Sequence, residues 1–169
     1  MGNKYRIILV LSLLLFTAVM TPAALYAYHF LYPAYAASQA AEGFFSSLCD
    51  NDIEGAFQYV AYFDRYSDVA PSISYGEAQR LWVDRVQALK DRGTYLKSYG
   101  DIKTGTDDGY PVGDVTVTVI EGGRADTYRA RIHFAWSHSK LKIQAVYPPV
   151  FSGKLEGFEY AISGSLKPD

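Results

Sequence analysis

The feature that most constrains this chain is an apolar stretch near its N-terminus. Residues 7–32 form a run of 26 positions without a single Lys, Arg, Asp or Glu. As an α-helix with about 1.5 Å of rise per residue, this run extends roughly 39 Å, which exceeds the ~30 Å hydrocarbon core of a bilayer. The sequence therefore predicts a transmembrane anchor over residues 7–32, with the lipid bilayer as its partner.

The charges before this run predict its orientation. Lys4 and Arg6 precede it, and basic residues favour the cytoplasmic side of a membrane. We expect residues 1–6 in the cytoplasm and the C-terminal domain outside the cell, on the cell membrane. The alternative is a secreted protein whose signal is cleaved near Ala36, after the pattern Ala34-Tyr35-Ala36. The run exceeds the ~7–15 apolar residues of a signal peptide, which favours the anchor.

The rest of the chain has the size and charge of one exported domain. Beyond residue 36 lie 133 of the 169 residues, enough for a single hydrophobic core. This part holds 14 of the 16 basic residues and all 18 acidic ones, for a formal charge of −4, which argues against a nucleic-acid partner. Cys49 is the only cysteine, so the domain has no intramolecular disulfide, and its thiol is expected to be buried or free.

The first half of this domain has the apolar spacing of helices. Residues recur at intervals of three and four over three segments, 37–48, 52–62 and 75–91. Asp52 is a favourable N-cap for the second helix, and Ser74 with Glu77 forms a capping box before the third. Gly93 is expected to end the third helix. Arg85 lies beside the apolar stripe of that helix, where we expect it to pair with an acidic residue.

From Thr94 onward the period changes to the alternation of strands. Alternating residues predict four strands, at 95–104, around 115–119, around 128–136 and at 141–147. Residues 105–113 form a connection whose Asp107-Asp108-Gly109 segment is expected to be a turn. It lacks the spacing and distal Glu of a calcium loop. Gly122-Gly123 and residues 137–140 are expected to form tight turns.

The turns predict which residues face each other across the sheet. The pairs expected in the hairpin at Gly122-Gly123 are Val117–Tyr128, Val115–Ala130 and Asp114–Arg131. Those expected in the next hairpin are Trp136–Leu141, Phe134–Ile143 and Ile132–Ala145. One face, including Tyr147, is then apolar, and the other carries polar and charged side chains. We therefore predict an α+β domain over residues 37–147, with three helices packed on one face of a curved antiparallel sheet.

The order of helices and strands resembles a known fold. The segments that carry the resemblance are 52–57, 82–86, 132–134 and 141–143. They are similar to parts of the nuclear transport factor two-like, or cystatin-like, fold, over roughly residues 37–147. With the apolar run, the chain also resembles small membrane-anchored proteins of Gram-positive bacteria. The resemblance implies a cleft between helices and sheet, in which enzymes of this fold hold an Asp or an Asp–His pair.

Residues 148–169 follow this domain as a C-terminal extension. The segment 150–166 begins after Pro148-Pro149 and contains several apolar residues. It could form an edge strand or wrap around the core, and the spacing of its apolar residues fits both.

Two groups of side chains are candidates for a binding site. Aromatic residues that could line the helix–sheet cleft are Trp82, Tyr128 and Trp136, although their spacing also suits an ordinary core. Basic residues that could form a docking face on the opposite side of the sheet are Arg129, Arg131, His133 and Lys142. The alternative for the second group is a solvated face in which Arg131 pairs with Asp114.

These patterns favour a protein without catalytic chemistry. No metal, cofactor or catalytic motif is recognisable, and the expected inward positions of the sheet are apolar. We predict a membrane-anchored, extracytoplasmic binding or assembly domain whose partner is another protein or a second copy. One alternative is a binder of small apolar ligands in the cleft. Another is an isomerase- or hydratase-type enzyme, for which the nearest candidate acids are Asp84, Asp101 and Asp126.

Overall fold

The computed structural model describes residues 2–26, 32–66, 69–148 and 157–166, in two compact units, 1–33 and 34–169. The first unit contains helix α1, Gly2–Tyr26, with Pro22 inside it. Among the described residues, no helix is both long enough and apolar enough to span a membrane. The anchor over residues 7–32 therefore stays a prediction, and its positions 27–31 lie outside the described residues.

The chain then forms three helices, as predicted, although one of them is much shorter than expected. They are α2, Tyr32–Cys49, α3, Ile53–Phe57, and α4, Tyr75–Asp91. The side chain of Asp52 accepts a hydrogen bond from the Gly55 amide, and that of Ser74 accepts one from the Glu77 amide, so both predicted N-caps are confirmed.

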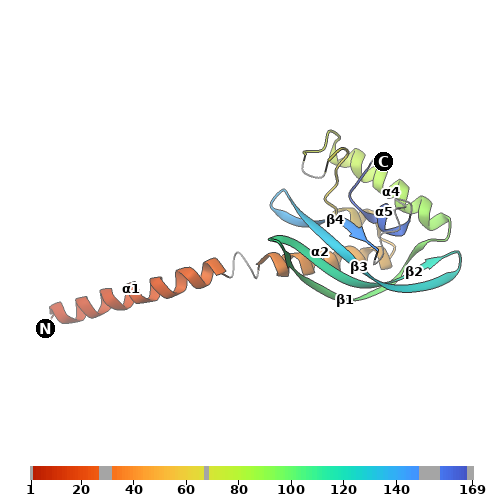
Figure 1. Ribbon diagram of the computed structural model, residues 1–169. Coiled ribbons are helices and arrows are strands. Elements are labelled where there is room, and N and C mark those ends of the chain that lie inside the picture. The colour runs from red at the N-terminus through yellow and green to blue at the C-terminus, as the bar shows by residue number, and fades with distance from the viewer. Residues whose placement is uncertain (1, 27–31, 67–68, 149–156, 167–169) are drawn as a thin grey trace. The chain divides into compact units, whose positions relative to one another are not determined.

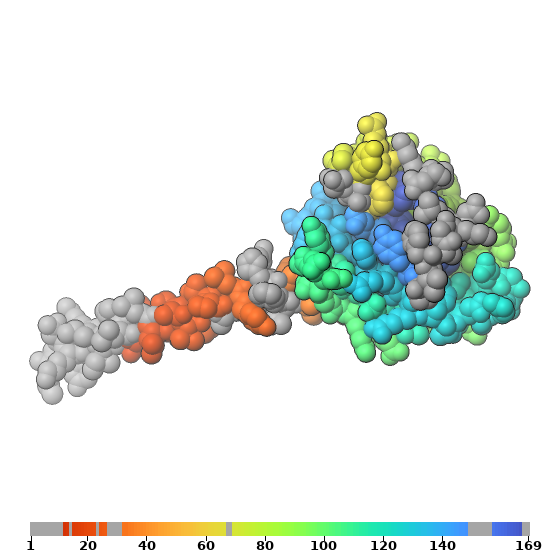
Figure 2. Space-filling model, in the orientation of Figure 1, coloured from red at the N-terminus to blue at the C-terminus, as the bar shows by residue number. Residues whose placement is uncertain are grey.

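A four-stranded antiparallel sheet follows, in the order β1-β2-β3-β4. Its strands are β1, Tyr95–Asp107, β2, Tyr110–Glu121, β3, Arg124–Ser137, and β4, Lys140–Tyr147. The connection predicted over residues 105–113 is wrong, because only Asp108 and Gly109 lie between β1 and β2. Both have positive φ angles, 49° and 83°, as in the tight turns that suit the twist of a hairpin. The tips of β1–β2 and β3–β4 lie at one end of the domain, and that of β2–β3 at the other (Figure 2).

The predicted register is confirmed between β2 and β3 but only partly between β3 and β4. Phe134 pairs with Ile143 as expected, yet Ile132 pairs with Val146 instead of Ala145. A bulge at Gln144 adds one residue to β4. Beyond it, Val146 is the residue that points inward, and it is buried.

Both the bulge and the early end of α3 occur where other segments form hydrogen bonds with the outer edge of β4. The chain after α3 runs along this edge: the Ala61 amide donates to the Ile143 carbonyl at 2.7 Å, and the Ile143 amide donates to the Tyr59 carbonyl at 2.8 Å. The Gln144 carbonyl accepts from the Gly164 amide at 2.8 Å. The helix predicted to reach residue 62 therefore ends at Phe57, because the following backbone covers a strand edge that would otherwise be open to pairing.

Within the second unit, helices α2, α3 and α4 gather on one side of the curved sheet, and the core lies between these two layers (Figure 1). The ring of Trp82 contacts those of Phe44 and Phe57, with centroids 6.2 and 5.6 Å apart. Large side chains with no solvent exposure fill the middle of this core, among them Phe44, Phe45, Phe57, Trp82 and Ile132. The α+β architecture, with helices packed on one face of an antiparallel sheet, is thus confirmed.

The described C-terminal residues, 157–166, contribute to the core. Helix α5, Phe158–Ile162, buries Phe158, Ala161 and Ile162, so this segment wraps around the core. Arg85 of α4 holds it in place by donating to the carbonyls of Ala161, at 3.0 Å, and Ser163, at 2.8 Å, and to that of Ser165. The prediction that Arg85 pairs with an acidic residue is wrong, because these carbonyls are its partners.

Candidate functional site on the outer face of the sheet

The outer face of the sheet contains a shallow hollow that includes most of the predicted docking face. Its volume is about 520 Å³. Its lining comes from β2, β3 and β4 and from the residue that follows β4. The lining residues are Asp114, Arg129, Arg131, His133, Tyr147 and Pro148. Three of the four predicted docking residues therefore lie together.

Two ion pairs hold the arginines of this hollow. Arg129 Nη2 lies 3.0 Å from Asp114 Oδ2, and Arg131 Nη2 lies 2.6 Å from Asp107 Oδ2. Asp114 and Arg131 are backbone partners, as predicted, but neither ion pair joins their side chains, and the Arg131–Asp107 pair reaches across β2 to β1. Exposed pairs of this kind add little stability, about 0–1 kcal/mol, but they orient the guanidinium groups.

An aromatic pair forms another wall of the hollow. The rings of His133 and Tyr147 meet edge to face, with centroids 4.9 Å apart. Tyr147 was expected on the apolar face, and the bulge at Gln144 moves it to the outer face, where it pairs with Arg131 in the strand register. The sequence offered no local signal for this position, and the bulge lies where the distant segments at Tyr59, Ala61 and Gly164 form hydrogen bonds with β4.

The surroundings of His133 favour its neutral form. Partial burial lowers the pKa of His133, the positive charge of Arg131 lowers it further, and Asp107 opposes the change. An imidazole with a depressed pKa binds fewer protons in the folded state than in the unfolded chain. Its contribution to stability is therefore complete above the unfolded pKa, about 6.5, and is lost as the pH falls toward the folded pKa.

Acidification is therefore expected to weaken the fold partly through His133. The melting temperature of the protein should fall more between pH ~7.5 and ~5 than that of a His133→Asn variant, because the variant has no imidazole to protonate. Proton-detected NMR titration of the ring should give a pKa below the ordinary value of about 6.5. A ring that titrates at or above this value, or equal pH dependence in both proteins, would contradict the prediction.

Lys142 is separated from the predicted docking face. Its ammonium lies over the ring of Tyr75, 6.0 Å from the centroid. Burial lowers the pKa of Lys142, and the charge of Lys140 lowers it further. The side chain therefore extends across the β4 edge toward α4, and it does not line the hollow.

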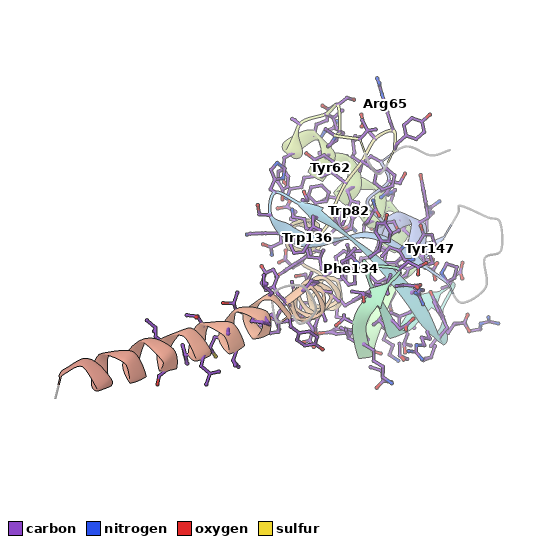
Figure 3. The ribbon with its side chains drawn as sticks, turned by 60° about the vertical axis from the view of Figure 1, so that its left-hand side comes forward. Tyr62, Arg65, Trp82, Phe134, Trp136 and Tyr147 are labelled. Carbon is purple, nitrogen blue, oxygen red and sulfur yellow. The ribbon has the colours of Figure 1, made fainter. Side chains whose placement is uncertain are left out.

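The three aromatic residues of the predicted cleft do not form one. Trp82 has no solvent exposure, and its indole Nε1 donates to the Ser163 carbonyl at 3.1 Å, so it belongs to the core. The hydroxyl of Tyr128 donates to Glu159 on α5. Trp136 is 50 % exposed near the β3–β4 tip, away from Tyr147 (Figure 3). Around Trp82 the helix–sheet interior is filled by buried side chains, and Tyr128 lines a separate hollow together with Phe158 and Glu159 of α5.

The acidic candidates and the cysteine lie apart from one another. Asp84 pairs with Arg80 at 3.6 Å on the exposed face of α4, and Asp126 pairs with Arg124 at 2.8 Å. Asp101 is exposed at an irregularity of β1, where it accepts a hydrogen bond from Thr116. All three acids are thus at the surface.

Burial, with a smaller effect of Asp50, raises the pKa of the Cys49 thiol.

The described part of the chain contains no group of three or more His, Cys, Asp or Glu side chains placed to hold a metal ion.

Comparisons with protein-family models, with curated protein sequences and with solved structures found no match for this chain. The resemblance to the nuclear transport factor two-like fold therefore stays a prediction.

Proposed function

We propose that this chain is a membrane-anchored, non-catalytic domain that binds another protein through the hollow on the outer face of its sheet. The main support for this proposal is the composition of the hollow. Two arginines, each held by an aspartate, lie beside the His133–Tyr147 pair. Arg and Tyr are among the residues that contribute most to protein–protein binding energy. Arginines already held by carboxylates lose little side-chain entropy when a partner binds.

The polar character of the hollow favours a polar protein segment as the occupant. Asp107 and Asp114 neutralise the arginines in part, so a strongly acidic polymer would meet a balanced surface instead of a basic one. Guanidinium groups keep further donors for backbone carbonyls or carboxylates of a partner, since each has five N–H groups. The aromatic edge of Tyr147 offers an apolar contact at the same site.

Anchoring is supported by the sequence. The uncharged run over residues 7–32 follows Lys4 and Arg6, and tyrosines cluster at its far end, as is typical of the membrane–water boundary. Treatment of intact cells with an external protease should digest the domain and leave a short N-terminal fragment in the membrane. Free protein in the medium with a new N-terminus near Ala37 would contradict the anchor and leave the binding proposal standing.

The binding proposal is tested by photocrosslinking in the cell. A benzoylphenylalanine at Thr116, the outer-face neighbour of Arg129, should form an adduct with a defined partner, which mass spectrometry identifies. The same probe at Gln87, on the exposed side of α4, is the control for random collisions. Arg129→Ala with Arg131→Ala should remove the Thr116 adduct while the melting temperature stays within a few degrees. An adduct that persists in this variant, or equal adducts at both positions, would refute the proposed site.

A further inference from the structure

A second hollow opens on the helical side of the domain, where the ends of several elements meet. It has a volume of about 250 Å³ and lies between the C-terminal ends of α2 and α4, the start of α3, the start of β1 and helix α5. Its apolar lining residues are Leu48, Ile53, Val86, Leu89, Leu96 and Phe158. No residue of this group belongs to the outer-face hollow, so the two sites are independent.

The lining of this hollow belongs to the edge of the apolar core. Ile53, Val86 and Phe158 retain 7–8 % exposure, whereas Phe44 and Trp82 at the centre have none. Water that enters the hollow thus touches side chains that belong to the apolar cluster. An apolar group placed here would remove this surface from water and gain the contacts that the gap lacks.

The mouth of this hollow is basic. Lys90, in the last turn of α4, and Lys97, on β1, both line it. The ammonium of Lys90 donates to the side-chain carbonyl of Asn51, which also lines the hollow. Within the described part of the chain neither lysine has a carboxylate within ion-pair distance, so both charges are available to a ligand.

The backbone of β1 explains how Lys97 reaches this position. The pairing of β1 with β2 shifts between Leu96 and Ser98, and Lys97 is the residue that has no partner across the sheet. Such a bulge re-aims a side chain relative to the strand alternation. Leu96 therefore points into the hollow, and Lys97, the next residue, lines it too.

We propose that this hollow binds a single-chain amphiphile with an anionic head, such as a fatty-acid carboxylate. The acyl chain occupies the apolar lining, and the head lies between Lys90 and Lys97. The charge of the mouth selects the anion, because a cationic head would be repelled by two ammonium groups. The small volume selects one chain over the two of a membrane lipid.

Cys49 provides a direct readout, because it lines the same hollow and is the only cysteine. The full chain is placed in nanodiscs of zwitterionic phosphatidylcholine, and the rate of Cys49 alkylation by a maleimide is measured with and without decanoate. We expect decanoate to slow alkylation at least fivefold. Decyl phosphate, tested in parallel, distinguishes a carboxylate site from a general anion site, and decyltrimethylammonium should give no protection.

Variants separate binding in the hollow from effects of decanoate on the bilayer. Lys90→Gln with Lys97→Gln should reduce the protection at least threefold, whereas Lys103→Gln, an exposed lysine of the same strand, should leave it unchanged. Val86→Phe, which fills the hollow, should slow alkylation without decanoate and remove any further effect of it. Absence of protection, equal protection by the cationic amphiphile, or protection that survives both lysine changes would overturn the proposal. None of these results affects the proposed protein-binding face.

Discussion

Replacing Arg85 by Met is expected to lower the free energy of unfolding by about 3 kcal/mol, because backbone carbonyls of the C-terminal segment lose a charged donor. The guanidinium reaches Ala161, Ser163 and Ser165, and it also lies over the ring of Tyr160, 5.2 Å from its centroid. Burial lowers the pKa of Arg85, since its environment disfavours the charge, although Tyr160 opposes this change. Urea denaturation followed by tryptophan fluorescence measures the loss.

The matched control for this variant lies on the same helix. Arg80 forms an exposed pair with Asp84, and Arg80→Met should change the free energy of unfolding by about 0.5 kcal/mol or less. Limited proteolysis should release the C-terminal segment from the Arg85→Met protein faster than from the Arg80→Met protein. If both variants lost equal stability, the three carbonyl bonds would not be what holds this segment.

Gly164→Ala is expected to cost about 3 kcal/mol or more, because the added methyl group has no room. A Cβ on Gly164 would lie 2.0 Å from the carbonyl oxygen of Ala61 and 3.1 Å from that of Gln144. Ala61 belongs to the segment that is hydrogen-bonded to the β4 edge, and Gln144 belongs to β4 itself, so neither can move without disturbing that pairing. The variant should melt well below the natural protein in calorimetry.

A second glycine provides the comparison. Gly76, in the first turn of α4, has no atom within 4 Å of the position of an added Cβ. Gly76→Ala should therefore stabilise the protein by roughly 0.5–1 kcal/mol, since alanine favours the helix. A Gly164→Ala protein as stable as the Gly76→Ala protein would show that Gly164 does not pack against the Ala61 carbonyl.

The Arg85→Met and Gly164→Ala predictions both concern contacts between segments far apart in the sequence. Such contacts could not be predicted from the sequence. The periodicity of α4 correctly indicated that Trp82 and Val86 are buried, but it assigned Arg85 an acidic partner. The carbonyls that Arg85 binds are available only because α5 packs against α4, about 76 residues later in the chain. Backbone acceptors carry no sequence signature, so no pattern of side chains indicates them.

The residues of the candidate site also fall into two groups, those that the sequence predicted and those that tertiary contacts decided. Arg129, Arg131 and His133 were placed on one face by strand alternation, which is local and holds wherever one face is buried. Tyr147 joined them only through the bulge at Gln144, whose carbonyl is bound by the Gly164 amide. Lys142 left the group because its side chain extends to Tyr75, a residue of α4.

The sequence by itself determined the α+β class, the N-caps at Asp52 and Ser74, the β2–β3 register and the apolar face of the sheet. These features depend on periodicity and on a few residues adjacent in the chain, where the physical preference is local. The tertiary structure alone decided where α3 ends, which residues of β4 turn inward, what Arg85 binds and where the core is left unfilled. Each of these depends on how distant backbone segments cover one strand edge and close one core, because unpaired edges and unfilled apolar space are costly wherever they occur.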